Sequence, residues 1–466
     1  MSTAGPAHRV QSAVVEYGYP QGHLGHLTAD EEAAFTNFKA LCAEKGYYKP
    51  GDSEGDPGTH DDATLLRFLR ARRFVVGDAF TQFEDTENWR KANQLDQLYE
   101  TIDLEHYEET RRLYPQWTGR RDRRGIPVYV FEVMHLNSKT MAAYEKSAVK
   151  THTKAQTDGK TSPKLLRLFA LYENLIRFVM PLCTALTDRD HPRTPITQSN
   201  NIVDISGVGL KQFWNLRGHM QDASTLATAH YPETLDRIFI IGAPAFFPTV
   251  WNWIKKWFDP ITTSKIFILS SHDMKETLEA FIDPANIPKK YGGQLEFVFG
   301  DMPKLDPAIK DVVKWQGDRD NFPGGPLYWC EKDKEGKEIQ LMAAGSTEDG
   351  TVLRHEEICT ITKTFPETAQ EMSEKQNGHL SPPEKGEQDL TAAATGTDGI
   401  PAAASESQTQ DEPERDNVGE AVDLSTKPMP ETFVSSSEGL PTLKNLKLDE
   451  DSKTSPNGDV KSGEAK

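Results

Sequence analysis

The chain has 466 residues, and its 71 acidic against 53 basic side chains give a formal net charge of −18. This acidity disfavours nucleic acid as a partner, because a negatively charged surface repels phosphate. The four cysteines form no CxxC pair, no uncharged apolar run is long enough to span a bilayer, and the N-terminus has no signal-like apolar core. We therefore expect a reduced, cytoplasmic protein without a zinc or disulfide framework and without a membrane span.

The N-terminal region has two parts of different character. Residues 1–28 mix Gly, Pro and His, which predicts a loosely ordered arm. Residues 29–95 carry apolar residues at helical spacing and predict a small helical module. Its first helix is expected over Ala29–Glu44, with Asp30 as the capping residue.

A cluster of arginines ends the second predicted helix. Asp61 and Asp62 suit the start of this helix, where a carboxylate satisfies free backbone N–H groups, and Asp78 is expected to cap the next helix. The apolar positions expected to be buried are Leu65, Leu66, Phe68 and Leu69. The basic positions are Arg67, Arg70, Arg72 and Arg73. A solvated face is the ordinary interpretation of such a pattern, but a guanidinium at a helix end can also point into a cleft.

Residues 100–298 alternate between strand-like and helix-like segments. The predicted elements are strands over 126–133 and 201–205, helices over 165–180 and 213–231, and exposed insertions at 138–163 and 188–195. Pro181 is expected to end the first of these helices, because proline lacks the N–H that a helix interior needs. The alternation predicts an α/β fold with a mixed or parallel sheet.

The segment from Thr234 to Phe267 predicts a parallel βαβ unit, with strands at 237–241 and 265–269 and a helix at 247–258. This helix is unusually rich in aromatic residues. Its apolar positions are Phe247, Val250, Trp251, Trp253, Ile254, Trp257 and Phe258. Such a helix is either buried on both sides, or it covers a cavity and also touches an apolar phase outside the protein.

The composition changes twice towards the C-terminus. Residues 299–365 contain short β-type runs at 327–330, 339–343 and 351–353, which predict a small β-rich extension. Residues 366–466 hold one aromatic residue, Phe433, and 21 acidic against 9 basic side chains. Such a segment cannot bury enough apolar surface to offset the entropy of ordering. We therefore expect a disordered acidic tail that binds protein partners.

No residue pattern of a known enzyme class is complete. The sequence DISG at 204–207 lacks the first glycine of a nucleophile elbow, and GKT at 159–161 lacks the earlier glycine of a phosphate-binding loop. A hydrolase built from Asp204, His230 and Ser199 is a remote alternative, because scattered triads can be drawn on almost any chain. We therefore expect no enzymatic activity.

The remaining polar groups point to a ligand with one anionic end. They are the arginines at the end of the second helix and a cluster formed by Glu233 and residues 262–265. Guanidinium and ammonium groups hold phosphate, while carboxylate and hydroxyl groups bind a polyol. A long apolar body would need an enclosed cavity with a movable cover, for which the helix at 247–258 is the candidate.

Several sequence blocks resemble the CRAL-TRIO lipid-transfer family, in particular its fungal phosphatidylinositol/phosphatidylcholine transfer branch. The blocks are DDATLLRFLRARRF at 61–74, YPQ at 114–116, GIPVY at 125–129, YPE at 231–233, FDPIT at 258–262, SKIFIL at 264–269 and PKKYGG at 288–293. They occur in one consistent order over about residues 30–298. The resemblance implies a helical N-terminal module followed by an α/β lipid-binding domain with a hydrophobic cavity. It also implies a gating helix that opens at a membrane.

The resemblance further implies which residues hold phosphatidylinositol. In the family the head group is held by residues that match Arg72, Arg73, Glu233, Thr262 and Lys265. Arg72 is expected at the phosphodiester, Thr262 and Lys265 at the rest of the head group, and Glu233 in an ion pair with Arg73. The gating helix falls on Phe247–Trp257.

The family's phosphatidylcholine site is matched less completely. Tyr129, Tyr172 and Ser199 match its positions, whereas Thr118 stands where a tyrosine is expected and Asn201 where a threonine is expected. A missing aromatic ring weakens a choline cage, because cation–π contacts need ring faces around the ammonium. Phosphatidylinositol is therefore the better supported ligand, and the second lipid stays open, with a sterol as one alternative.

Three roles share such a site. The protein transfers phosphatidylinositol between membranes, or it regulates by presenting this lipid to a lipid kinase, or it carries a neutral ligand of the tocopherol or retinoid kind. The head-group cations argue against the third role, because a neutral ligand has no use for Arg72 and Lys265. The resemblance implies a monomer that contacts membranes such as Golgi or endosomes transiently and needs no cofactor beyond its bound phospholipid.

Overall fold

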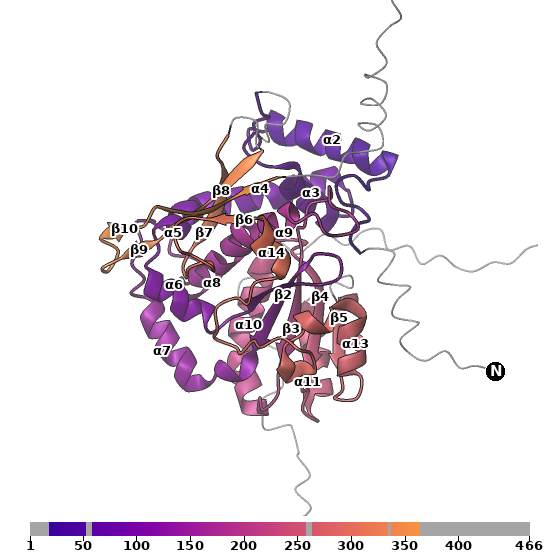
Figure 1. Cartoon of the computed structure of the whole chain (residues 1–466), viewed down its shortest axis with the longest axis vertical. Helices are drawn as coiled ribbons and strands as arrows, with labels where there is room; N and C mark the ends of the chain where they lie inside the picture. Colours follow the sequence, from indigo (N-terminus) through magenta and orange to yellow (C-terminus); the bar gives the residue numbers. More distant parts are fainter. Residues whose placement is uncertain (1–17, 53–57, 258–262, 334–336, 364–466) are drawn as a thin grey trace, which may run out of the picture. The chain divides into compact units, whose positions relative to one another are not determined.

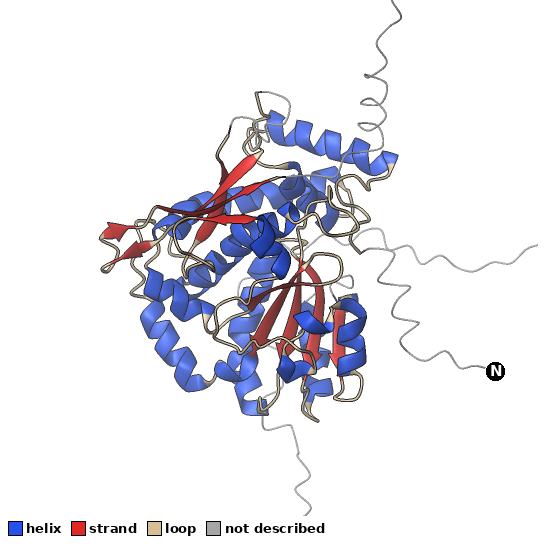
Figure 2. Cartoon of the chain, viewed as in Figure 1, coloured by secondary structure: helices blue, strands red, loops and turns tan. Residues whose placement is uncertain are grey.

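The computed structural model describes residues 18–52, 58–257, 263–333 and 337–363. The acidic tail, Phe258 and Thr262 lie outside these ranges, and so does the side chain of Trp257. A central sheet with helices on both faces organises the described residues (Figures 1 and 2).

The central sheet is mixed, with the strand order β1-β2-β3-β4-β5. Its strands are β1 (Gln116–Arg121), β2 (Pro127–Glu132), β3 (Ser199–Asp204), β4 (Leu235–Ile241) and β5 (Ile266–Leu269). β1 pairs antiparallel with β2, and the strands from β2 to β5 run parallel. With α11 (Phe247–Ile254) between β4 and β5, the predicted parallel βαβ unit is confirmed, and so is the α/β class.

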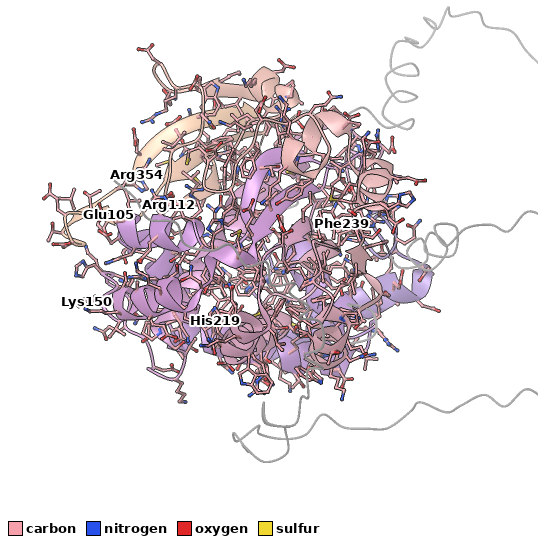
Figure 3. All side chains as sticks on the ribbon, turned by 90° about the horizontal axis from the view of Figure 1, so that it is seen from below. Glu105, Arg112, Lys150, His219, Phe239 and Arg354 are labelled. Carbon is pink, nitrogen blue, oxygen red and sulfur yellow. The ribbon has the colours of Figure 1, made fainter. Side chains whose placement is uncertain are left out.

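The two faces of this sheet pack on different elements. Val128, Ile202 and Phe239 lie on the face covered by α13 (Met274–Phe281) and the segment after it. Phe239 is fully buried there and is labelled in Figure 3. Ile240, next to it in β4, belongs to the opposite face and packs with α8 (Pro163–Asn174), α10 (Leu210–His230) and α11. Successive strand residues point to opposite faces of the sheet, so the β-branched run of β4 packs on the helices of both faces.

The helix predicted to end at Pro181 continues beyond it, so that prediction is wrong. α8 runs into a π-helical segment at Leu175–Val179 and then into α9 (Met180–Ala185). The π-helical turn shifts the hydrogen-bond register just before Pro181, which then occupies the first turn of α9, where no N–H is required. By length and hydropathy alone Pro163–Ala185 is able to cross a membrane, but 61% of its most apolar window is buried inside the protein, as in the core helix of a soluble protein.

The N-terminal module consists of α2 (Ala29–Glu44), α3 (Asp62–Ala71) and α4 (Val76–Ala92). The four apolar residues predicted to be buried in α3 are all in its core, where they pack with Phe35, Phe38 and Phe83. Asp61 caps α3 as predicted, since its side chain accepts a hydrogen bond from the Thr64 N–H at 2.6 Å.

The other two predicted caps are wrong. Thr28 caps α2 instead of Asp30, and it forms a reciprocal capping box with Glu31. Asp78 lies in the first turn of α4, which has no side-chain cap, although its carboxylate still favours the positive end of the helix.

Short helices connect the module to the sheet and close the domain. They are α5 (Leu95–Thr101), α6 (Leu104–Arg111), α7 (Ser138–Ala148) and the 3₁₀ turns Val133–His135, Lys255–Trp257, Pro284–Asn286 and Lys289–Tyr291. Lys290 in the last of these turns reaches Glu132 at 2.7 Å and Asp204 at 2.9 Å, so it ties the closing segment to the ends of β2 and β3.

The C-terminal extension forms a second sheet in the order β6-β11-β8-β7. Its elements are α14 (Pro307–Val312), β6 (Val313–Trp315), β7 (Leu327–Glu331), β8 (Glu338–Ala343) and β11 (Glu356–Thr362), with a hairpin of β9 (Ser346–Thr347) and β10 (Val352–Leu353). Sequence reasoning found the positions of β7, β8 and β10 but missed β11, which lies between β6 and β8. Leu341 and Ile358 share one hydrophobic core with Trp117 of β1 and Phe178 of the π-helical segment.

The described part of the N-terminal arm is packed rather than loose. Tyr19 and His23 are 5% and 2% exposed. The Tyr19 hydroxyl donates to the Thr194 carbonyl at 3.1 Å and accepts from Arg189 at 2.6 Å. The arm therefore lies against the loop at 188–195, which was predicted as an exposed insertion.

Candidate functional site

Glu233 brings together three parts of the chain that are far apart in sequence. Its carboxylate oxygen Oε2 lies 3.2 Å from Arg70 Nη2 of α3 and 3.5 Å from Lys265 Nζ just before β5. Lys265 also donates to the Leu235 carbonyl at 3.2 Å. An ammonium has three donors, so these two described partners leave room for an acceptor from a ligand.

The turn that carries Glu233 is held in a strained conformation. Glu233 has φ 57°, a left-handed value that a non-glycine residue adopts only when its surroundings enforce it. Arg67, 5% exposed, donates to the Pro232 carbonyl at 3.2 Å. Tyr231 donates to Glu173 at 2.6 Å, and Arg90 pairs with the same carboxylate at 2.7 Å. The predicted basic face of α3 is therefore partly buried and holds this turn.

The buried Glu173 carboxylate is electrostatically balanced. Burial alone would raise the pKa of Glu173, but attraction to Arg90 and the hydrogen bonds from Arg90 and Tyr231 together outweigh it, so its pKa lies below the ordinary value. The carboxylate therefore stays charged at neutral pH and anchors both Arg90 and Tyr231. The Arg90–Glu173 pair thus links α4 and α8 to the turn that carries Glu233.

Arg72 and Arg73 form the end of α3. The Phe74 N–H bonds the Leu69 carbonyl at 2.9 Å and the Arg73 N–H bonds the Arg70 carbonyl at 3.0 Å, which is a Schellman cap. Arg73 occupies the left-handed position of this cap, with φ 50°, where glycine is usual. Its side chain is exposed, while Arg72 is half-buried and its only described side-chain bond is to the Ala71 carbonyl at 3.4 Å.

The expected pairing of Glu233 with Arg73 is not the one observed. The regular helix ends at Ala71, so Arg73 does not continue the helical spacing of Arg67 and Arg70. Arg70, still in the last helical turn, forms the ion pair instead, with its side chain 8% exposed. Thr262, the remaining predicted head-group residue, lies outside the described residues.

The predicted gating helix begins at Phe247 and is α-helical to Ile254. Phe247 and Val250 are buried in the cluster that contains Phe213 of α10. Trp251 and Ile254 are half-buried against the same cluster, and the half-buried Trp253 lies 6.1 Å from Trp214 of α10 between ring centroids. Of the other predicted positions, Phe258 and the side chain of Trp257 lie outside the described part.

The residues predicted for a second lipid fall into two groups. Tyr129, Tyr172, Ser199 and Asn201 form the first, and Thr118 alone forms the second. Tyr129 of β2 lies directly opposite Asn201 of β3, and the Asn201 amide donates to the Ser199 hydroxyl at 3.2 Å. The Tyr172 ring of α8 lies 4.9 Å from the Tyr231 ring between centroids, in a tilted arrangement. Thr118 is fully buried and donates to the Val128 carbonyl at 2.9 Å, so its hydroxyl is used within the sheet.

Sequence reasoning missed Trp117. This residue precedes Thr118 and pairs across the sheet with Tyr129, so the two rings lie on the same face. Trp117 and Tyr129 also belong to one core cluster, together with Phe178 at 5.8 Å from the Trp117 ring. The sequence did contain a signal for Trp117. Side chains alternate along β1, so a residue next to Thr118 must face the other way.

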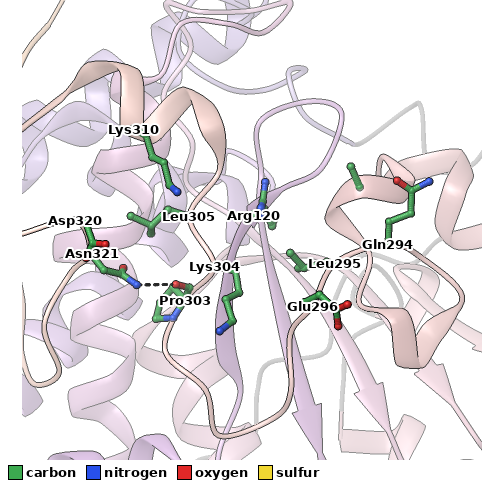
Figure 4. Close-up of a pocket in the computed structure, with 11 residues that line it drawn as sticks. Arg120, Gln294, Leu295, Glu296, Pro303, Lys304, Leu305, Lys310, Asp320 and Asn321 are labelled. Carbon is green, nitrogen blue, oxygen red and sulfur yellow. Dashed lines mark hydrogen bonds between the residues drawn. The ribbon is translucent and has the colours of Figure 1, made fainter.

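A separate cleft of about 520 Å³ lies along the free edge of β1 and contains none of the predicted lipid-binding residues (Figure 4). It forms where the 303–306 segment runs beside β1, with the Lys304 N–H bonded to the Thr118 carbonyl at 2.8 Å. Arg120, Lys304 and Lys310 line this cleft, but Glu296 and Asp320 line it as well. Its mixed charge distinguishes it from the cation-rich end of α3.

The remote hydrolase alternative is not supported by the geometry. Asp204 binds Lys290, His230 stacks on Trp89 at 4.1 Å, and the Ser199 hydroxyl donates to the Thr234 carbonyl at 3.2 Å. Each candidate triad residue therefore belongs to a different set of contacts. Within the described ranges, no group of three His, Cys, Asp or Glu side chains is arranged to hold a metal ion.

Two family profiles match the chain. The profile of the CRAL/TRIO domain covers residues 111–293, and that of the CRAL/TRIO, N-terminal domain covers residues 34–85. The chain is 33% identical over 277 residues to the SEC14 cytosolic factor of Eremothecium gossypii, a match that covers 59% of this chain and 79% of that protein.

Two further relatives are matched over less of their length. The SEC14 cytosolic factor of Yarrowia lipolytica is 34% identical over 298 residues, which are 63% of this chain and 54% of that protein. The phosphatidylinositol/phosphatidylcholine transfer protein SFH7 of Arabidopsis thaliana is 34% identical over 245 residues, 51% of this chain and 40% of that protein. The chain thus spans about half the length of the Yarrowia relative. These relatives bear the names of a cytosolic factor and a transfer protein, not of enzymes, and the chain belongs to their CRAL-TRIO family as a homologue of the fungal Sec14 cytosolic factors.

Proposed function

We propose that this protein binds phosphatidylinositol, extracts it from membranes into a closed cavity and exchanges it against a second lipid. The observation that carries the proposal is the Arg70–Glu233–Lys265 cluster beside the cationic end of α3. A carboxylate held between two cations, with Arg72 and Arg73 adjacent in the chain, presents both acceptors and donors to an inositol phosphate. The Arabidopsis relative named above is a transfer protein for this lipid.

The proposed division of labour follows the chemistry of the head group. Arg72 and Arg73 bind the phosphodiester, because guanidinium groups form strong, charge-assisted hydrogen bonds to phosphate. Lys265 and Thr262 bind inositol hydroxyls or phosphate. Glu233 keeps Lys265 in place through their contact at 3.5 Å.

The gate in this proposal is α11. Phe247 and Val250 are buried, Trp253 is half-buried beside Trp214, and the lysines Lys255 and Lys256 are exposed. Aromatic and basic residues together favour the interfacial region of a bilayer. Movement of α11 away from α10 would open the apolar layer between this helix and the sheet to acyl chains.

The second lipid would occupy the wall formed by Tyr129, Tyr172, Ser199 and Asn201, with Trp117 taking the place of the missing tyrosine ring. An indole face supplies cation–π stabilisation of about 0.5–2 kcal/mol to a choline group. The same residues would also accept a neutral lipid such as a sterol, so an experiment has to identify the second lipid.

The site of action would be the cytoplasm with transient contact to membranes such as Golgi or endosomes, and the acidic tail would bind protein partners.

A vesicle-to-vesicle assay tests the proposal. Labelled phosphatidylinositol in donor vesicles should move to acceptor vesicles in proportion to the concentration of full-length protein. Labelled phosphatidylserine, which lacks the polyol, serves as the control lipid. Equal movement of both lipids, or of neither, would contradict the proposal.

A further inference from the structure

The N-terminal arm contacts the candidate head-group cluster through one buried histidine. The ring nitrogen Nε2 of His23 lies 2.8 Å from Arg70 Nη1, and His23 Nδ1 lies 3.0 Å from the Gln21 carbonyl. A carbonyl only accepts, so the Nδ1 atom carries the proton and Nε2 accepts from Arg70. Burial and the charge of Arg70 lower the pKa of His23 to about 3, which keeps the ring neutral and able to accept at neutral pH.

Arg70 is therefore held at both ends of its guanidinium. Nη1 donates to His23, and Nη2 lies 3.2 Å from Glu233 Oε2. With an exposed fraction of 8%, the Arg70 side chain has little water to replace a lost partner. Glu233 in turn contacts Lys265, so one continuous set of contacts runs from the arm to the proposed ligand.

The arm itself is anchored from behind. Tyr19 packs edge-on against His23 at 5.1 Å between ring centroids, and its hydroxyl is bound by Arg189 and by the Thr194 carbonyl. The loop at 188–195 thus holds the arm, and the arm holds Arg70. The N-terminal arm and the loop at 188–195, which lie outside the sequence blocks of the family, therefore both contribute to holding Arg70.

We infer that His23 is a positioning residue for phosphatidylinositol, which fixes Arg70 on Glu233 and thereby keeps the Lys265 ammonium available to the head group. The inference rests on the proposed function. Loss of the acceptor at His23 frees Arg70 to rotate, and the strained Glu233 then loses its firmest partner. Its carboxylate would pair more closely with Lys265 and occupy the donors that the lipid needs.

The test compares three single variants of the full-length protein. His23→Phe keeps an aromatic ring against Tyr19 but removes the acceptor. His23→Gln restores an acceptor, because its amide oxygen can receive the Arg70 donor. His26→Phe is the matched control, because His26 belongs to the same arm. Its ring packs on His191 of the loop at 188–195, at 4.9 Å between ring centroids. The measurement is the amount of phosphatidylinositol taken up per protein from mixed vesicles that contain it as a minor component, together with Tm by circular dichroism.

His23→Phe should lower phosphatidylinositol uptake about tenfold or more, which is the effect expected for losing one hydrogen bond to a charged group. His23→Gln should recover most of the uptake, and His26→Phe should match the wild type. Wild-type uptake by His23→Phe would overturn the inference, and so would equal losses in all three variants that follow Tm. Absence of phosphatidylinositol from the wild-type protein would instead overturn the proposed function itself.

Discussion

Arg70 Nη2 lies 3.2 Å from Glu233 Oε2, although Arg73 was the predicted partner of this carboxylate. The reason is the end of α3, where Arg73 turns into a left-handed conformation and points to solvent. The arginine that pairs with Glu233 is therefore a different residue from Arg72 and Arg73, the arginines proposed to bind the ligand. This separation allows binding and stability to be tested independently.

Arg73→Gly should leave the fold intact or stabilise it while weakening phosphatidylinositol binding. Glycine adopts the left-handed position without strain, which removes a cost of about 1 kcal/mol. The lost guanidinium should lower phosphatidylinositol uptake several-fold. Urea unfolding and vesicle uptake measure the two effects, and Arg73→Ala provides the control, because it loses the cation but keeps the strain. A less stable glycine variant, or one with wild-type uptake, would contradict the assignment.

Removal of either proposed head-group cation should abolish transfer without unfolding the protein. In Lys265→Ala and in Arg72→Ala, Glu233 retains its contact with Arg70, so Tm should change little. Transfer of phosphatidylinositol should fall by more than about tenfold, which corresponds to 1.4 kcal/mol of lost binding. Lys275→Ala is the matched control, since this exposed lysine pairs with Glu279 on α13. Full transfer by both variants would refute the proposed site.

The elements with the strongest local patterns were predictable from sequence. The β-branched apolar run at 237–241 and the helical spacing of apolar residues at 247–258 predicted the parallel βαβ unit, because strand and helix patterns differ clearly there. The prediction that Pro181 ends the helix was wrong, because the π-helical turn that accommodates this proline depends on packing along α8 and leaves no signal in the local sequence. Arg70 and His23 were missed as site residues for the same reason, because their partners lie 163 and 47 positions away in the chain.

Glu173→Ala should strongly destabilise the protein. The change leaves the half-buried Arg90 without its main partner and removes the acceptor of Tyr231, and breaking an ion pair with a buried carboxylate costs up to about 3–5 kcal/mol. Asp96→Ala removes the other carboxylate at Arg90, but this residue is mostly exposed, so its loss should cost less than about 1 kcal/mol. Urea unfolding at neutral pH distinguishes the two. Equal stability of the two variants would show that Glu173 does not anchor the turn before Glu233.

The free energy of unfolding should fall as the pH drops below about 6.5. Burial, with nearby positive charge, lowers the pKa of His23 to about 3 and those of His219 and His230 to about 4. The unfolded chain therefore binds more protons than the folded chain between these values and the ordinary histidine pKa. At pH 5 each histidine should cost roughly 2 kcal/mol of stability, because one pKa unit corresponds to about 1.4 kcal/mol.

Urea unfolding between pH 7 and pH 5 measures this loss. His23→Gln should reduce the slope, since glutamine does not titrate. An identical slope in the His23 variant and the wild type would contradict a buried neutral histidine beside Arg70.

The central claim is that the Glu233 cluster recognises phosphatidylinositol. Its most direct test is mass spectrometry of the lipid that co-purifies with full-length protein after incubation with mixed vesicles. The account predicts stoichiometric phosphatidylinositol in the wild-type protein and its loss from Lys265→Ala, with any second lipid retained. A wild-type protein that emerges without phosphatidylinositol, or a Lys265→Ala variant that still carries it, would contradict the account.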